Sequence, residues 1–182
     1  VLGDSGLTFT DKIVWSKPGG VFDIPRSQHI ENYRYYPAFG YELIFIYRVS
    51  SMPTFDPPDK ALAREYQINK WEMPSVATND ESVAGHSAAF PVRLPELVAR
   101  FYSQSGQILY DPFMGSGTTI IAAQMTGRRC FGVEKKPAYV DVAVKRWQDY
   151  TGETAFLGDE RMPWAEVEYE RENDVSSVET AS

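Results

Sequence analysis

The sequence predicts an α/β protein with a mostly parallel sheet, and three observations support this class. Helix-like and strand-like patterns alternate along residues 86–150 with short turns, as in a parallel sheet with crossover helices. Residues 10–50 add two β-rich apolar runs. The chain has 182 residues, 43% of them hydrophobic and 24% charged, which is the composition of a globular domain and not of a disordered or collagen-like chain.

The first half of the chain contains two predicted strands and a connector. Residues 12–15 (KIVW) form a short apolar run that ends at the turn sequence KPGG. Residues 41–49 (YELIFIYRV) are apolar on both faces, so we expect this strand to lie inside the sheet. Four prolines make residues 51–85 a connector without long regular elements, apart from one or two helical turns over 61–66.

Five elements follow in the second half, each predicted from the spacing of its apolar residues. They are a helix over 94–102, a strand over 107–110, a helix over 118–126, a strand over 129–133 and a helix over 137–150. Gly127 and Gly152 are expected to end the last two helices. These elements belong to a domain over residues 1–152. Residues 153–182 have little periodicity and much charge, and we predict that they form an acidic, disordered tail.

The net charge of −7 does not exclude a nucleic-acid partner, because the charge is concentrated at one end of the chain. Residues 151–182 hold nine acidic and two basic residues, and residues 1–150 are neutral overall. The acidic excess is therefore a property of the tail.

Composition also limits the setting in which the protein works. Cys130 is the only cysteine, so no internal disulfide can form, and a reducing cytoplasm is the natural location. No apolar run approaches the roughly 20 residues of a membrane span, so we expect no membrane partner. The sequence has no zinc-like spacing of cysteines and histidines, and we expect no metal.

Residues 108–119 (ILYDPFMGSGTT) give the strongest functional signal. A predicted strand ends at Asp111, a turn with Gly115 and Gly117 follows, and a helix begins at once. Ligands of open α/β sheets bind at the carboxyl ends of the strands, and glycines let a ligand approach the backbone. The amide groups at the helix start favour a negative group such as a carboxylate.

Three hydroxyl side chains, Ser116, Thr118 and Thr119, can cap the helix or donate hydrogen bonds to the ligand. A phosphate-binding loop would need a lysine after the second glycine, and a dinucleotide-binding loop would need a third glycine where Ile120 stands. The turn therefore suits a zwitterionic ligand better than a polyphosphate. A capped strand-to-helix turn without any ligand stays open as the alternative.

A second carboxylate, Glu134, ends the next predicted strand, 23 residues after Asp111. An acidic residue at this distance from a glycine turn is placed to accept hydrogen bonds from both hydroxyls of a ribose. The alternative is a solvated glutamate at a strand end. The neighbouring Asp111 and the glycine turn favour the ribose role.

Several segments resemble one enzyme family. DPFMGSGTT, followed by GRRCFGVEKKPAY and AVKRW, resembles the cofactor half of DNA methyltransferases that modify exocyclic amino groups of adenine or cytosine. HSAAFPVRLPELVARF resembles the family's helix motif before that turn, and IVWSKP and YELIFIYR resemble its late strands. The resemblance covers residues 10–152 and implies a Rossmann-like methyltransferase fold, mostly parallel with an antiparallel late strand.

By this resemblance, residues 1–152 form a methyltransferase domain. Its parts are late strands over 10–50, a connector over 51–85 and a cofactor-binding part over 86–152.

The resemblance also implies S-adenosylmethionine as the cofactor and assigns roles to individual residues. Glu134 would hold the ribose hydroxyls. Phe90 and His86 would lie at the methionine end, although Phe90 is as readily a core aromatic and His86 a structural residue. The methionine part would be held by the turn residues Asp111, Pro112, Phe113, Gly115, Ser116, Gly117 and Thr118.

The family's catalytic tetrapeptide is not found where the resemblance would place it. It reads Asp/Asn/Ser-Pro-Pro-aromatic after an apolar strand; its polar residue holds the target amino group and its aromatic stacks on a flipped base. The only Pro-Pro here is Asp56-Pro57-Pro58-Asp59, which lacks the aromatic and the apolar strand, and we interpret it as a chance match. We expect the tetrapeptide upstream of Val1, which leaves the catalytic residues unknown and the fold incomplete in this chain.

Two classes of function are compatible with these features. The first is a site-specific DNA methyltransferase seen as its cofactor-binding part, inactive alone, with DNA as substrate. The N-terminal part of the same protein or a partner chain would complete it, and a homodimer is a further possibility. The second is a non-catalytic S-adenosylmethionine-binding or interaction module. A pure DNA-binding module has less support, because no helix-turn-helix pattern or basic stripe is present. The sequence distinguishes neither adenine from cytosine nor a restriction, phage or housekeeping role.

Overall fold

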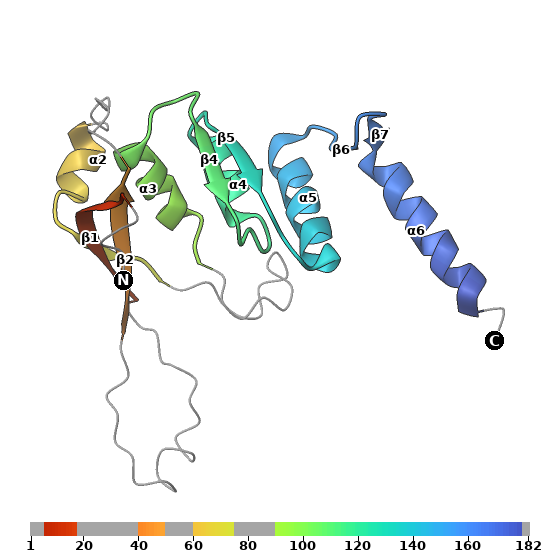
Figure 1. Cartoon of the computed structure of the whole chain (residues 1–182), viewed down its shortest axis with the longest axis horizontal. Coiled ribbons are helices and arrows are strands. Elements are labelled where there is room, and N and C mark those ends of the chain that lie inside the picture. The colour runs from red at the N-terminus through yellow and green to blue at the C-terminus, as the bar shows by residue number, and fades with distance from the viewer. Residues whose placement is uncertain (1–5, 18–39, 50–59, 75–89, 180–182) are drawn as a thin grey trace, which may run out of the picture.

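The computed structural model describes residues 6–17, 40–49, 60–74 and 90–179 (Figure 1). The first part comprises β1 (Thr8–Ser16), β2 (Tyr41–Arg48), α2 (Lys60–Glu65) and β3 (Lys70–Glu72). The second part comprises α3 (Arg93–Tyr102), β4 (Ile108–Asp111), α4 (Thr118–Met125), β5 (Arg129–Gly132) and α5 (Pro137–Thr151). The last part comprises β6 (Phe156–Leu157), β7 (Met162–Pro163) and α6 (Trp164–Glu179).

The first sheet has the strand order β2-β1-β3. β1 pairs with β2 antiparallel and with β3 parallel, so this sheet contains the expected antiparallel late strand. The prediction that residues 41–49 lie inside a sheet differs from the arrangement of the described strands, among which β2 lies at an edge, with Leu43, Phe45 and Tyr47 39–51% exposed. β3 was also missed, because a strand of three residues is too short to show a period.

A hydrophobic core joins this sheet to α3. Its buried members are Ile13, Trp15, Trp71, Met73, Leu94 and Leu97. The indole Nε1 of Trp15 donates a hydrogen bond of 2.9 Å to the carbonyl oxygen of Met73, so the polar atom of this buried ring is satisfied. α3 is thereby fixed against the sheet, and Phe90 just before it packs on the same core.

The second sheet is the parallel pair of β4 and β5, with α4 as the crossover helix. The predicted elements over 107–110, 118–126, 129–133 and 137–150 are confirmed to within one residue at most ends. α4 contacts α3, β5 and α5. Arg128, between α4 and β5, donates to the carbonyl oxygens of Ser103 at 2.7 Å and Ala99 at 3.3 Å, which ties this unit to the end of α3.

The segment after α5 is not wholly disordered, and this corrects the prediction for residues 153–182. β6 and β7 pair antiparallel, and α6 follows them. Trp164 and Val167 of α6 are buried, and Arg171 forms an ion pair with Asp141 of α5 at 2.7 Å. These two apolar residues fall among many acidic ones, so the helical spacing of apolar residues was hidden in the sequence by the high charge. None of the described helices combines the length and apolar character needed to cross a bilayer.

Candidate functional site

The turn between β4 and α4 depends on two glycines. Gly115 and Gly117 have φ angles of +56° and +81°, in the left-handed region that favours glycine. A Cβ atom on Gly117 would also lie 2.7 Å from the Cβ atom of Ala143 on α5. The sequence thus needs glycine at position 117 for its backbone angle and for the close approach of α5.

Asp111, at the carboxyl end of β4, stabilises this turn with both oxygens of its carboxylate. Its Oδ1 accepts a hydrogen bond of 3.0 Å from the backbone N–H of Phe113. Its Oδ2 accepts one of 2.6 Å from the hydroxyl of Thr119, in the first turn of α4. The strand end and the helix start are therefore joined through one carboxylate.

Glu134 reaches the same turn from the end of β5. Its Oε2 accepts a hydrogen bond of 2.9 Å from the N–H of Gly115, and its Oε1 accepts one of 2.8 Å from the N–H of Lys136. The β4–β5 register sets Asp111 opposite Gly132, so both strands end at the same level. A carboxylate offers about four acceptor positions, so one carboxylate can bind backbone amides and a ligand group at the same time. In the part of the chain that the structure describes, they belong to no metal-binding cluster.

Of the two roles predicted for the three hydroxyl side chains, the structure excludes capping of α4. The N-cap residue of α4 is Gly117, so none of them caps the helix. Ser116 and Thr118 are each only 4% exposed, and their hydroxyl oxygens accept hydrogen bonds from Arg146 of α5. A ligand at the turn would therefore meet their backbone and not their side chains. The third hydroxyl, of Thr119, is engaged by Asp111.

Arg146 is a residue of this site that the sequence analysis missed. A detectable signal was present, because Arg146 stands three positions after Ala143, on the face of α5 predicted to be apolar. A charged residue on such a face needs a polar partner.

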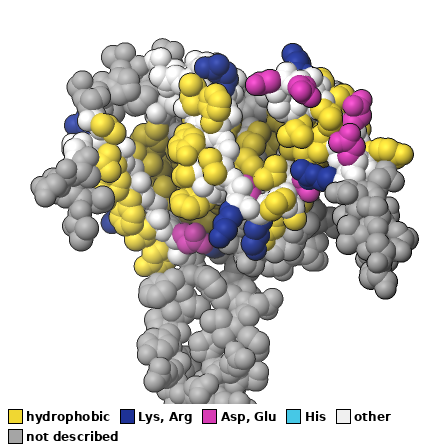
Figure 2. Space-filling model, turned by 45° about the vertical axis from the view of Figure 1, so that its right-hand side comes forward, with side chains coloured by type: hydrophobic (Ala, Val, Ile, Leu, Met, Phe, Trp, Pro, Cys, Tyr) yellow, Lys and Arg dark blue, Asp and Glu magenta, His cyan; other side chains and the backbone are white. Residues whose placement is uncertain are grey.

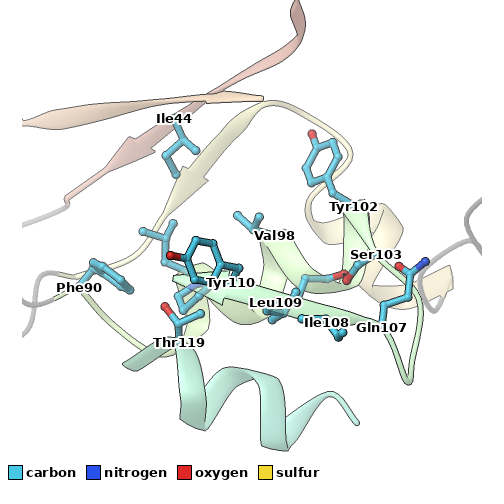
Figure 3. A pocket seen from close by; sticks show the side chains of 13 residues that line it. Ile44, Phe90, Val98, Tyr102, Ser103, Gln107, Ile108, Leu109, Tyr110 and Thr119 are labelled. Carbon is cyan, nitrogen blue, oxygen red and sulfur yellow. Dashed lines mark hydrogen bonds between the residues drawn. The ribbon is translucent and has the colours of Figure 1, made fainter. Parts of the chain in front are cut away.

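Phe90 lies in a cavity of about 500 Å³ beside the turn (Figure 3). Thr119 and Tyr110 also line this cavity, with Val98 of α3 and, across the gap, Ile44 of β2. The structure thus places Phe90 and Thr119, at the start of α4, around the same cavity. His86, Asp56, Pro57 and Pro58 lie outside the described residues.

Pro112 and Phe113 form the first half of the turn, and the side chain of Phe113 is 88% exposed. A large apolar side chain held in the open beside two carboxylates is available for contact with a ligand.

The thiol of Cys130 on β5 offers a test of this environment. Burial, followed by the negative charge of Asp111, raises its pKa from 9.0 to about 11. At pH 8 the thiolate fraction falls about a hundredfold, and the higher nucleophilicity of a more basic thiolate offsets about tenfold of this. We expect alkylation by iodoacetamide at pH 8 to be roughly tenfold slower in the folded protein than in urea. Equal rates would contradict this environment.

Comparison with solved structures shows a Rossmann-like methyltransferase fold. A structure titled PvuII DNA methyltransferase (cytosine-N4-specific) matches with a TM-score of 0.67 and 22% identity over 82% of this chain and 55% of that chain. A structure of an M1.HpyAVI–SAM complex matches with a TM-score of 0.59 and 24% identity, over 80% of this chain and 65% of that one.

The family follows from the sequence. A family model described as DNA methylase matches residues 1–145, and the chain belongs to this family. The type II methyltransferase M.BglI of Bacillus subtilis is 39% identical over 80 residues, which are 44% of this chain and 22% of that protein. The chain thus spans less than two thirds of the length of each of these proteins.

Proposed function

We propose that this chain is the S-adenosylmethionine-binding part of a site-specific DNA methyltransferase that modifies the exocyclic amino group of adenine or cytosine. The observation that carries the proposal is the convergence of Asp111 and Glu134 on one glycine turn. This turn lies at the carboxyl ends of parallel strands, where open α/β sheets bind their ligands. Membership of the DNA methylase family supports methyl transfer, and the M1.HpyAVI–SAM complex supports the choice of cofactor.

The residues at the turn fit the chemical groups of this cofactor. The amide groups at the start of α4 suit its carboxylate. Asp111, beside them, suits the positively charged amino group, and Glu134 suits the ribose hydroxyls. The exposed ring of Phe113 and the cavity next to Phe90 provide apolar contact. When bound, the cofactor supplies a methyl group activated by a positively charged sulfur.

Replacement of Glu134 by glutamine tests the cofactor site. The amide oxygen of glutamine can still accept from the N–H of Gly115, but the charge is lost and the amide nitrogen cannot accept from the N–H of Lys136. Hydrogen bonds to charged groups are worth about 1.5–3 kcal/mol. We therefore expect calorimetry to show S-adenosylmethionine binding weakened by roughly tenfold or more.

A matched control for this variant is Glu153→Gln, which removes the same charge from an exposed position after α5. The control should bind as the unchanged protein does. Unchanged affinity in Glu134→Gln would remove Glu134 from the site, and absence of binding by the unchanged protein would refute the proposed function.

The proposal includes a second segment that completes the fold. β4 pairs only with β5 among the described strands, so its other edge is open. Four apolar side chains of this sheet and its end are more than half exposed, and we call them the open face: Ile108, Tyr110, Phe131 and Val133. Parallel sheets are normally covered on both faces. Hydrophobic side chains are exposed over much of the surface seen in Figure 2.

We assign this open face and the β4 edge to the N-terminal part of the enzyme, which would supply the catalytic tetrapeptide. It would belong to the same protein or to a partner chain. The cavity between β4 and Ile44 supports this assignment, because it separates two sheets whose facing strands are both edges. Asp56-Pro57-Pro58 remains the alternative catalytic segment, and a non-catalytic cofactor-binding module remains the alternative function.

A further inference from the structure

One side chain of α5 binds the glycine turn from its inner side. The Nη1 atom of Arg146 donates to the carbonyl oxygen of Ser116 at 2.6 Å, to the hydroxyl of Ser116 at 2.9 Å and to the hydroxyl of Thr118 at 3.3 Å. Ser116 and Thr118 are buried. Arg146 itself is half-buried, and its guanidinium acts on these buried residues of the turn from the side of α5.

The same helix also limits the turn by direct contact. Ala143, one helical turn before Arg146, is buried and leaves no room for a Cβ atom on Gly117. α5 thus fixes two consecutive peptide units of the turn, one by van der Waals contact and one by a charged hydrogen bond.

The turn is consequently held from two directions. The carboxylates of Asp111 and Glu134 bind the amides of Phe113 and Gly115 on the side of the strand ends. Arg146 binds the carbonyl at the point where the turn enters α4. It also places a positive charge behind the first amide groups of the helix, which adds to the potential that attracts an anion there.

We propose that Arg146 is a positioning residue for the methionine end of the cofactor. It orders the amides at the start of α4 and raises the local positive potential, and both effects increase the affinity of the turn for the methionine carboxylate. The hydrogen bonds of Arg146 to Ser116 and Thr118 lie at the start of α4, the part of the turn assigned to the methionine end. This inference rests on the proposed function.

The test compares two ligands and three variants of the full chain. S-adenosylmethionine carries the methionine carboxylate, whereas 5′-methylthioadenosine keeps the adenosine and lacks that carboxylate. The variants are Arg146→Met, Arg146→Lys and the control Lys145→Met, which removes the same charge from the neighbouring exposed position of α5. Binding is measured by calorimetry, and ordering of the turn by hydrogen–deuterium exchange of residues 113–120.

Arg146→Met should weaken S-adenosylmethionine binding by roughly tenfold or more, the scale of one lost charged hydrogen bond. It should change 5′-methylthioadenosine binding by less than about threefold and speed amide exchange in the turn. The affinity of Arg146→Lys for S-adenosylmethionine should fall between those of the unchanged protein and Arg146→Met. Lysine keeps the charge but lacks the several N–H donors of the planar guanidinium. Lys145→Met should change neither ligand.

Equal losses for both ligands would assign Arg146 a general structural role and overturn the inference. The inference would also be overturned if Arg146→Met bound S-adenosylmethionine as tightly as the unchanged protein, or if amide exchange in the turn were unaltered. Failure of the unchanged protein to bind either ligand would overturn the proposed function and this inference together, and is thereby distinct from failure of the inference alone.

Discussion

If the proposed function holds, the 182-residue chain by itself is expected to bind the cofactor, to self-associate and to transfer no methyl group to DNA. The elements that build the cofactor turn are all present between β4 and α5. The open face and the edge of β4, however, expose apolar side chains and unpaired backbone groups. Such an edge is a template for pairing with another chain.

Analytical ultracentrifugation and a methyl-transfer assay on the same sample test this expectation. Addition of the N-terminal part of the enzyme, covalently or as a second chain, should give one monodisperse species and restore transfer. A matched variant, Tyr110→Lys with Phe131→Lys, places two charges on the open face and should reduce self-association without restoring activity. A monomeric 182-residue chain that methylates DNA unaided would return attention to Asp56-Pro57-Pro58.

The second large effect is expected from Gly117→Ala. Alanine in the left-handed region costs about 1–2 kcal/mol, and overpacking of a filled site adds about 1–3 kcal/mol. The free energy of unfolding should thus fall by about 2–5 kcal/mol, and a displaced turn should lose its ligand. Urea denaturation at fixed protein concentration measures the first change, and calorimetry measures the second.

Two other glycines separate the causes in this experiment. Gly106 and Gly152 also have positive φ angles, of +81° and +72°, but nothing lies within 4 Å of the positions that their Cβ atoms would take. Their alanine variants should show the backbone cost alone, about 1–2 kcal/mol. If Gly117→Ala lowered the free energy of unfolding no more than these two variants, the close approach of Ala143 would make no contribution to stability.

Local patterns predicted the second half of the fold well. β4, α4, β5 and α5 combine apolar periodicity with a glycine near each helix end, so their bounds could be placed closely. β2 shows a different outcome, because its two apolar faces indicate an interior strand and the structure leaves it at an edge. The pattern is the one expected if further strands pair with β2 in the completed enzyme.

The acidic and glycine parts of the site were predictable for a similar reason. Asp111 and Glu134 follow directly from strand ends, and parallel strands end at one edge of a sheet. Arg146 and the buried orientation of Ser116 and Thr118 were not, because they depend on how α5 packs against the turn. Side-chain direction at a residue with a neighbouring positive φ cannot be inferred from spacing along the chain.

The hydrogen bond from Gly115 to Glu134 makes one side chain serve both halves of the proposed ligand site. A ligand group that orders Glu134 also orders the amide of the turn, and a group that orders the turn also orders Glu134. Binding at the adenosine end would therefore be coupled to order in the Phe113–Gly115 half of the turn, and substitutions at Glu134 and Gly115 would have non-additive effects. Glu134 and this half of the turn then form a single thermodynamic unit, separate from the Ser116–Thr118 half that Arg146 holds.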